Sequence, residues 1–223
     1  TLGQLTATVS HEIRNPLGTI QTAIFSIGDS LERNELHRVK RSLELAERSI
    51  IRCVNIIEEL TNFTRVKKLN TTKTSLNDWL KTVLDEQVIL EDVCCEFELA
   101  SGTCAQIDQE KLRQVIINLI TNAVHALLAK KSNGKLLQIS THLFDDEYEI
   151  RVRDNGIGMS DETRGKVFEP LFSTKGFGVG LGMVIAKDIV EQHHGEISIE
   201  SMDGKGTTVT LRLPIRPPEG EAQ

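Results

Sequence analysis

Apolar residues recur at intervals of three or four near the start of the chain, which predicts one amphipathic helix. This first stripe consists of Leu2, Leu5, Val9, Ile13, Leu17, Ile20, Ile24 and Ile27. A second stripe, close to a heptad seam, consists of Leu36, Val39, Leu43, Ala46, Ile50, Cys53, Val54, Ile57 and Leu60. A turn at residues 28–30 would join the two helices as a hairpin. Because one hairpin cannot cover both stripes, we expect a homodimer, in which two copies form a four-helix bundle.

The pattern then changes to short alternating segments between helical ones. We expect strands at 95–99, 103–107, 136–144, 148–153, 195–202 and 207–213, the last four as two hairpins. Helices are expected from a Ser75 cap to Leu90, from an Asp108 cap to about Lys130, after Ser160, and up to about Glu191. The predicted fold of this part is an α+β sandwich, an antiparallel or mixed sheet covered by helices. The expected domains are 1–68 (helical hairpin), 73–216 (α+β part) and 217–223 (a disordered, proline-rich tail).

Composition narrows the possible functions. The 223-residue chain has a net charge of −6 and scattered basic residues, which disfavours nucleic acid as a partner. No apolar run approaches the roughly 20 residues of a membrane helix, so no membrane contact is expected within this sequence. The four cysteines match no metal or redox spacing, as expected of a reduced cytoplasmic protein. The chain opens on Thr1 in helical register, which predicts a piece of a longer protein whose upstream part could hold a membrane span.

His11 lies about 180° from the middle of the first stripe, so its side chain is expected in water rather than in a core. Glu12 follows at once and could take a proton from the imidazole. A hairpin used only for dimerisation would explain the stripes but not an exposed His-Glu pair. This pair indicates a nucleophilic imidazole placed where a large partner can reach it.

Two clusters of the α+β part suggest a nucleotide site. Asn118, Asn122 and His125 share one helix face, and two carboxamides suit a Mg²⁺ that already carries water and phosphate oxygens. Helix-surface amides are an equally simple explanation. Asp154 follows a strand and could accept a hydrogen bond from an exocyclic amine such as that of adenine, while Gly156 and Gly158 would let the backbone approach a ligand. A plain strand-to-helix turn would give the same residues.

Two further clusters follow. Residues 168–175 hold two phenylalanines in a loop, as in a hinge or lid, and Lys175 is placed to meet a terminal phosphate. A small satellite core under a long loop is the structural alternative. Gly178, Val179, Gly180, Leu181 and Gly182 then lead into a helix, whose backbone N–H groups can bind anions. The glycine run is neither a Rossmann fingerprint nor a P-loop.

The order of these motifs resembles the sensor histidine kinases of two-component systems over nearly the whole chain. Residues 11–17 are similar to the phosphoacceptor box, and the four clusters are similar to the N, G1, F and G2 boxes. The short lid is most similar to the nitrogen-regulatory branch. Val209 departs from the pattern, since many relatives carry an aromatic residue there. The resemblance implies a HisKA-type dimerisation and phosphoacceptor domain followed by a GHKL-type ATP-binding domain.

The resemblance also implies roles for single residues. His11 would be phosphorylated from ATP, with Glu12 as the base, and would pass the phosphoryl group to an aspartate of a response regulator. Asn15 would position water for dephosphorylating that regulator, and we expect it to lie too far along the helix to serve the imidazole's proton. In the nucleotide site, Asn122 would bind Mg²⁺, Asn118 and His125 would lie near the phosphates, and Asp154 would read adenine, supported by Thr207 through water. The alternative function is an ATP-gated dimeric interaction module of the GHKL ATPase type, without histidine phosphorylation.

Overall fold

The computed structural model of the protein describes residues 2–33, 35–64, 69–87, 92–100, 102–144, 146–174 and 180–215, apart from the side chains of residues 2–8, 55, 58–59 and 62–64. The expected sites at Lys175, Gly178 and Val179 and the expected tail therefore lie outside the described residues. The chain divides into two compact units, residues 1–66 with 169–182 and residues 67–168 with 183–223. The domain boundaries expected from the sequence stay predictions.

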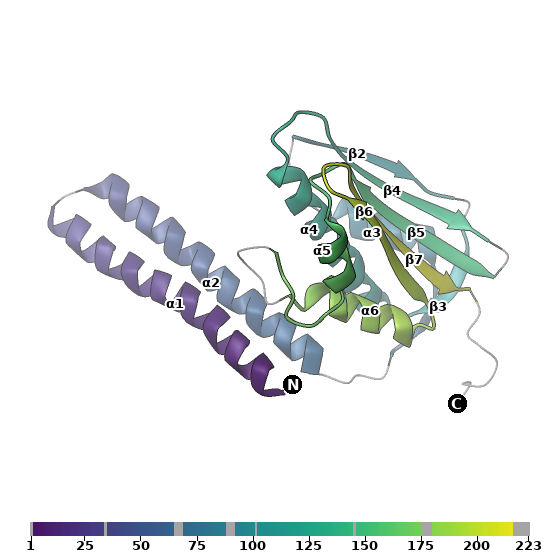
Figure 1. The fold of residues 1–223 in the computed structure, drawn as a ribbon, viewed down its shortest axis with the longest axis horizontal. Helices are drawn as coiled ribbons and strands as arrows, with labels where there is room; N and C mark the ends of the chain where they lie inside the picture. Colours follow the sequence, from purple (N-terminus) through teal and green to yellow (C-terminus); the bar gives the residue numbers. More distant parts are fainter. Residues whose placement is uncertain are drawn as a thin grey trace. The chain divides into compact units, whose positions relative to one another are not determined.

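The first unit contains a helical hairpin of α1 (Leu2–Glu32) and α2 (Leu36–Thr64) (Figure 1). The turn expected at residues 28–30 is wrong, because α1 continues through them and ends at Glu32. Ser30 is buried, and its carbonyl accepts a hydrogen bond from the Glu35 amide at 2.8 Å. The helix therefore continues through the point where the glycine and polar residues indicated a break, and Ser30 packs within the hairpin.

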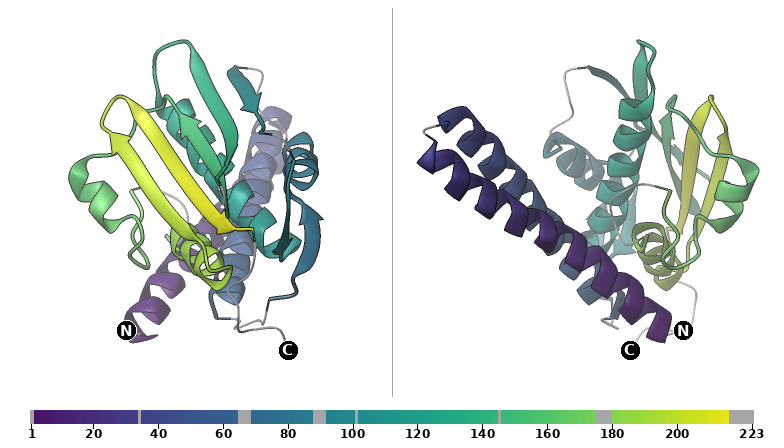
Figure 2. Two further views of the ribbon diagram at one scale, coloured as in Figure 1. Left: turned by 90° about the vertical axis from the view of Figure 1, so that its right-hand side faces the viewer. Right: turned by 60° about the vertical axis from the view of Figure 1, so that its left-hand side comes forward.

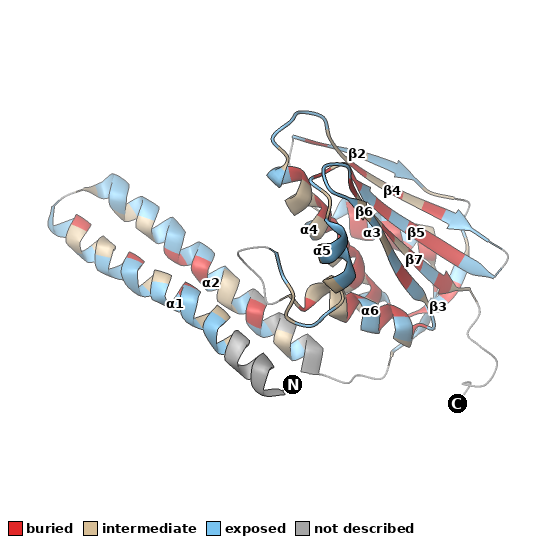
Figure 3. Ribbon diagram, viewed as in Figure 1, coloured by how far each residue is buried: buried red, intermediate tan, exposed pale blue. Residues whose placement is uncertain are grey.

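The contact between the two helices is a seam made mostly of small residues, and among the described side chains Ala46 is the buried member of the predicted apolar stripes. The buried positions are Pro16, Ala23 and Ser30 on α1 and Ala46, Ser49 and Ile56 on α2. Short side chains let two helix backbones approach closely, and the seven-residue steps keep the seam on one side of α1. Much of the hairpin is exposed in the single chain (Figure 3). Leu17, Ile24, Leu43 and Ile57 of the predicted stripes are among its exposed side chains.

The second unit is built around a five-stranded mixed sheet. Its strands follow the order β2-β4-β5-β7-β6, with β2 parallel to β4 and the other neighbours antiparallel. A separate antiparallel pair joins β1 to β3. The elements are β1 (Thr72–Ser75), α3 (Leu76–Asp85), β2 (Val93–Glu98), β3 (Cys104–Ile107), α4 (Gln109–Ala129), β4 (Lys135–Leu143), β5 (Glu147–Asp154), α5 (Asp161–Lys166), α6 (Gly182–Gln192), β6 (Glu196–Met202) and β7 (Gly206–Pro214).

Helices α3, α4 and α6 lie on one face of this sheet (Figure 2). The strand residues that face them, such as Leu137, Ile139 and Ile150, are buried, because alternate residues of a strand point to opposite faces. This arrangement is the α+β sandwich that the sequence predicted. By length and composition, α4 also qualifies as a helix that could cross a membrane, contrary to the sequence expectation. Its apolar residues, including Leu119 and Leu127, are buried within this unit, which is typical of a core helix.

Local signals at the helix starts are partly confirmed. The Asp108 side chain caps α4 by accepting a hydrogen bond from the Lys111 amide at 3.1 Å. Ser75 precedes α3 as expected but makes no capping bond; its hydroxyl donates instead to the Asp78 carboxylate at 2.6 Å. Helix α3 ends at Asp85 rather than Leu90: the Gln87 amide bonds the Leu84 carbonyl, three residues back, so the four-residue pattern of the helix stops there.

Candidate functional site

His11 is exposed on α1, as the phase of the first stripe predicted. The Asn15 amide nitrogen lies 3.4 Å from the His11 Nδ1 atom, so Asn15 is not too far along the helix to reach the ring, although an amide nitrogen donates and cannot take the imidazole's proton. Residues four apart face one another on a helix, and both side chains here are polar. The contact ties the ring tautomer to the amide: an amide that donates to Nδ1 leaves the ring proton on Nε2, whereas an amide oxygen facing Nδ1 holds the proton there and leaves the Nε2 lone pair available.

Glu12 points toward the neighbouring helix and not into open solvent. Its Oε2 atom lies 3.0 Å from the Arg52 Nη2 atom on α2, and both side chains are half-buried. Sequence reasoning missed Arg52, because forty positions separate it from Glu12 and nothing local marks it. The signal available was the hairpin itself, which places the middle of α2 beside the start of α1.

The asparagine cluster lies on α4 as predicted. Asn118 and Asn122 are half-buried, and the Asn122 amide donates to the Asn118 Oδ1 atom at 3.4 Å. Both amide nitrogens also lie near the Met183 sulfur on α6, at 3.6 and 3.4 Å. Sequence reasoning missed Met183, although it directly follows the glycine run. His125, one helical turn further, is half-buried.

These two asparagines fit a magnesium ion better than a resident transition metal. Carboxamide oxygens are hard ligands, and Mg²⁺ usually takes only one or two protein oxygens besides water and phosphate. The Met183 thioether is a soft ligand that does not suit Mg²⁺, so it is a neighbour and not part of the donor set. Within the described ranges, His, Cys, Asp and Glu form no group of three or more that could hold a metal.

Asp154 ends β5 with a buried carboxylate. Its Oδ1 atom accepts a hydrogen bond from the Gly156 amide at 2.8 Å. Burial raises the pKa of Asp154 above its usual value, although hydrogen bonds from the Gly156 and Thr207 amides and the charge of Lys130 lower it. Thr207 is the cross-strand partner of Asp154, and its hydroxyl bonds the Ser201 hydroxyl at 3.0 Å. A buried carboxylate held in this way is suited to accept a hydrogen bond from a polar ligand.

The two glycines after Asp154 are required by the protein's own packing. A Cβ on Gly156 would lie 2.6 Å from the Ala126 carbonyl carbon of α4. Gly158 has a φ of +67°, and a Cβ there would lie 2.0 Å from the Met202 carbonyl oxygen. The sequence had assigned these glycines to the approach of a ligand. The structure shows that they first let the turn pack between α4 and the β6–β7 hairpin.

The glycine run before α6 is described in part. Gly180 is half-buried, Leu181 is buried, and Gly182 begins α6. The run therefore leads into a helix as predicted, which places backbone N–H groups of a helix start at this point.

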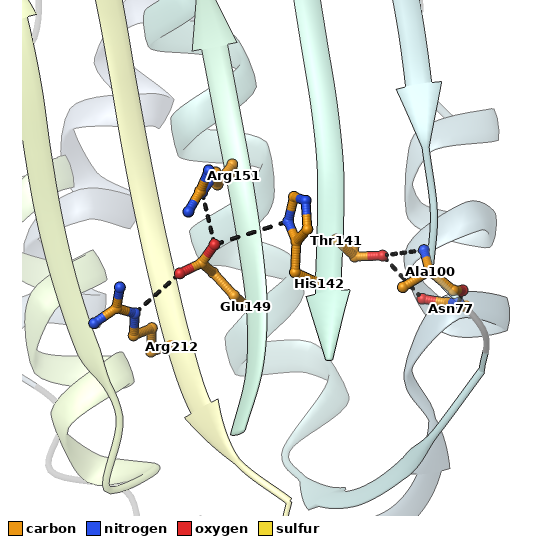
Figure 4. Close-up of polar contacts among 7 residues, drawn as sticks. All are labelled: Asn77, Ala100, Thr141, His142, Glu149, Arg151 and Arg212. Atoms are coloured by element: carbon orange, nitrogen blue, oxygen red, sulfur yellow. Dashed lines mark hydrogen bonds and ion pairs between the residues drawn. The ribbon is translucent and has the colours of Figure 1, made fainter. Parts of the chain in front are cut away.

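The face of the sheet that α3, α4 and α6 do not cover carries a polar hollow of about 730 Å³. Asp154 and Thr207, two residues of the predicted nucleotide site, are among the residues that line it. Glu149 is buried on this face between the Arg151 Nε atom at 2.6 Å and the Arg212 Nε atom at 2.9 Å (Figure 4). Burial raises the pKa of Glu149, but the two guanidinium groups outweigh it and hold that pKa below its usual value. Arg212 and His142 are the cross-strand partners of Glu149, so this cluster holds three strands in register.

Figure 4 also shows a polar network at the end of β4. The Ala100 amide donates to the Thr141 hydroxyl at 2.8 Å, and that hydroxyl lies 3.5 Å from the Asn77 Oδ1 atom. The same Asn77 oxygen also accepts the Tyr148 hydroxyl, which the figure does not draw. These bonds satisfy buried polar groups where α3 meets the sheet.

Comparisons with known proteins match both units. Residues 1–68 match the family model "His Kinase A (phospho-acceptor) domain", and residues 107–217 match "Histidine kinase-, DNA gyrase B-, and HSP90-like ATPase". The signal transduction histidine-protein kinase AtoS of Escherichia coli K12 is 32% identical, over 97% of this chain and 35% of its own length. The sensor histidine kinase ZraS of Klebsiella oxytoca is 34% identical, over 100% of this chain and 48% of its own length. The chain thus spans less than half of either relative.

Solved structures give the same result for the fold. The crystal structure of histidine kinase ThkA in complex with the response regulator protein TrrA matches 98% of this chain and 63% of its own, with a TM-score of 0.74 and 25% identity. The catalytic domain of ThkA alone matches 67% of this chain and 98% of its own, with a TM-score of 0.58 and 25% identity.

Proposed function

This chain belongs to the sensor histidine kinases of two-component systems, and from that membership we propose that it is an ATP-dependent protein-histidine autokinase. His11 accepts the γ-phosphoryl group of ATP and passes it to an aspartate of a response regulator. The observation that carries the proposal is the exposed imidazole of His11, followed directly in the sequence by the half-buried carboxylate of Glu12. A structural histidine would lie in the seam between the helices, which His11 does not.

In the proposed phosphoryl transfer, this chain supplies both the nucleophile and the general base. The lone pair of a His11 ring nitrogen forms the N–P bond while the bond from the γ-phosphorus to the bridging oxygen breaks and its electron pair leaves with ADP. The remaining ring proton passes to Glu12, which acts as the general base. Mg²⁺, when bound, supplies positive charge that neutralises the phosphate oxygens.

The ATP site would be formed by the residues predicted from the sequence. Asp154 would accept from the adenine amine, with Thr207 beside it, and Asn122 would hold Mg²⁺. The remaining contacts would come from Asn118 and His125 near the phosphates and from the turns and lid, namely Gly156, Gly158, Lys175, Gly178, Val179, Gly180, Leu181 and Gly182. The buried and amide-bonded carboxylate of Asp154 supports this assignment.

The proposed partners are a second copy of this chain and a response regulator. A homodimer is supported by the exposed apolar side chains of α1 and α2, which two copies would cover as a four-helix bundle. A receiver domain is supported by the likeness to ThkA, which was solved in complex with a response regulator protein. We place these units in the cytoplasm, where ATP is available.

Labelling with γ-labelled ATP tests the proposal. We expect an acid-labile, base-stable label that maps to His11, since phosphoimidazoles have this stability. Hydrolysis of ATP without such a label would favour the second candidate, an ATP-gated interaction module of the GHKL type. The second candidate is favoured by the match of residues 107–217 to a model that also covers DNA gyrase B and HSP90.

Regulator-phosphatase activity is proposed for the same hairpin, with Asn15 as the residue that orients water. Because the Asn15 amide also touches the His11 ring, Asn15→Ala should lower autophosphorylation modestly, by roughly threefold, and phosphatase activity by roughly tenfold or more. Both activities are measured on one preparation with the cognate regulator. Equal losses would remove the specific role in dephosphorylation.

A further inference from the structure

The ion pair between Glu12 and Arg52 joins the two helices next to the proposed phosphoacceptor. The Glu12 Oε2 and Arg52 Nη2 atoms are 3.0 Å apart, with the side chains 23% and 31% exposed. The ion pairs Asp29–Arg33 and Glu35–Arg38, by contrast, join residues three or four apart and lie at the turn end of the hairpin. Glu12 is thus connected across the hairpin, at the end that carries His11.

Helix geometry alone does not set the Glu12 carboxylate beside the imidazole. Successive helical residues diverge by about 100°, so His11 and Glu12 leave the backbone in different directions. Glutamate also has three rotatable side-chain bonds, and their freedom is lost only when the carboxylate is held. In this hairpin the holding group is the guanidinium of Arg52, which reaches the carboxylate from α2.

We infer that Arg52 is a positioning residue for the phosphorylation of His11, acting through Glu12. This inference rests on the proposed kinase function. The planar guanidinium fixes the direction of the carboxylate, and the packed hairpin fixes Arg52. Proton transfer from the imidazole depends on the place of that carboxylate, so loss of Arg52 should slow the chemical step without weakening ATP binding.

The test uses the full 223-residue chain and measures autophosphorylation at saturating ATP together with nucleotide affinity. Arg52→Met keeps the apolar stem and removes the ion pair. We expect roughly a tenfold loss of rate, unchanged affinity, and partial recovery in Arg52→Lys, which restores the charge with one donor group instead of a fork. Arg48→Met is the matched control: it removes the same charge one turn earlier on α2, where the Arg48 guanidinium bonds the Glu44 carbonyl of its own helix.

A double-mutant cycle separates action through Glu12 from a merely structural role. If Arg52 acts through Glu12, Glu12→Gln combined with Arg52→Met should be no slower than Glu12→Gln alone. Multiplied losses, an equal loss in Arg48→Met, or an unchanged rate in Arg52→Met would each overturn the inference. Helical content is checked by circular dichroism, and if Arg52→Met does not fold, Arg52→Gln replaces it in the same cycle. Failure of the unmutated chain to form the acid-labile label would instead overturn the kinase proposal.

Discussion

The helical hairpin and the sheet unit differ in how much of their apolar surface is buried within the single chain. In the hairpin, Phe25 is 80% exposed and the buried seam is made mostly of small residues, whereas in the sheet unit Leu80 and Tyr148 are fully buried. Figure 3 shows the same contrast between the two units in the colouring of the ribbon. The candidate chemistry follows the same division. His11 is exposed on a unit that leaves apolar surface uncovered, and Asp154 is buried in a unit with a completed core. In the proposed function, the exposed group of the first unit reacts with other macromolecules and the buried group of the second binds a small ligand.

Removal of the imidazole gives the largest effect and tests whether the two sites are independent. His11→Gln should abolish the acid-labile label completely, because the nucleophile is lost. It should leave nucleotide affinity unchanged, since the proposed ATP contacts come from residues 118–207. Titration with a fluorescent nucleotide measures this second point. A large loss of affinity would mean that His11 has a structural role and that the division fails.

Paired truncations sharpen the contrast in burial. Leu80→Ala should lower the free energy of unfolding of the sheet unit by about 2–5 kcal/mol, because it leaves a cavity in a closed core. Leu43→Ala, at a half-exposed position of α2, should instead weaken self-association. Urea denaturation at several protein concentrations separates the two. If the unfolding of the unmutated hairpin did not depend on concentration, the exposed stripe would need an occupant other than a second copy.

Asp154→Asn tests the proposed role of the buried carboxylate in the sheet unit. The amide can donate toward the adenine amine that the carboxylate would accept from, so ATP affinity should fall by about 1.5–3 kcal/mol while the fold persists. Competition of ATP against GTP on the unmutated chain is the sharper measurement. Equal binding of both nucleotides would show that Asp154 does not read adenine.

The smallest expected effect is a pH dependence confined to the sheet unit. The buried His193 ring accepts a hydrogen bond from the Asp108 amide at 3.0 Å through Nε2, and its Nδ1 atom lies 2.7 Å from the Ile189 carbonyl. Burial lowers the pKa of His193 below its usual value, so the unfolded chain binds the proton more readily. Stability should be complete above the unfolded pKa of about 6.5 and should fall as the pH drops toward the lowered folded pKa.

His193→Gln, which can still accept from the Asp108 amide, should remove that dependence. Denaturation midpoints at about pH 7.5 and about pH 5.5 provide the measurement. An identical slope in both proteins would assign the dependence to other groups.

The parts of the fold that could be predicted from the sequence are those that depend on the spacing of apolar and polar residues along a short segment. The helical stripes, the β4–β5 and β6–β7 hairpins and the Asp108 cap all follow from residues within a few positions of one another. The parallel pairing of β2 with β4 could not be predicted, because strands separated by a helix carry no local sign of their register. The end of α3 was missed for a similar reason, since no glycine or proline marks it.

The candidate site could likewise be predicted only where the signal was local in the sequence. Motif residues could be named, but their partners from distant segments could not: Arg52 beside Glu12, and Met183 beside Asn118 and Asn122. The contact between Asn15 and His11 is an exception, because the four-residue spacing already allowed it. This contact was not predicted, because the Asn15 amide was assigned from the sequence only to the binding of a water molecule.

Strand β2 forms one edge of the five-stranded sheet and pairs with β4, so a truncated fragment that lacks β2 would expose β4. The ATPase family model begins at residue 107, after β2 and α3. A chain cut there would keep every motif residue of the ATP site, yet β4 would become the sheet's outer strand, with its backbone donors and acceptors open to any other chain. Such a fragment is expected to self-associate through its edges and precipitate, and the removed strand supplied as a peptide is expected to keep it dispersed. The shortest piece that carries the motifs is therefore not the shortest piece that can stay in solution.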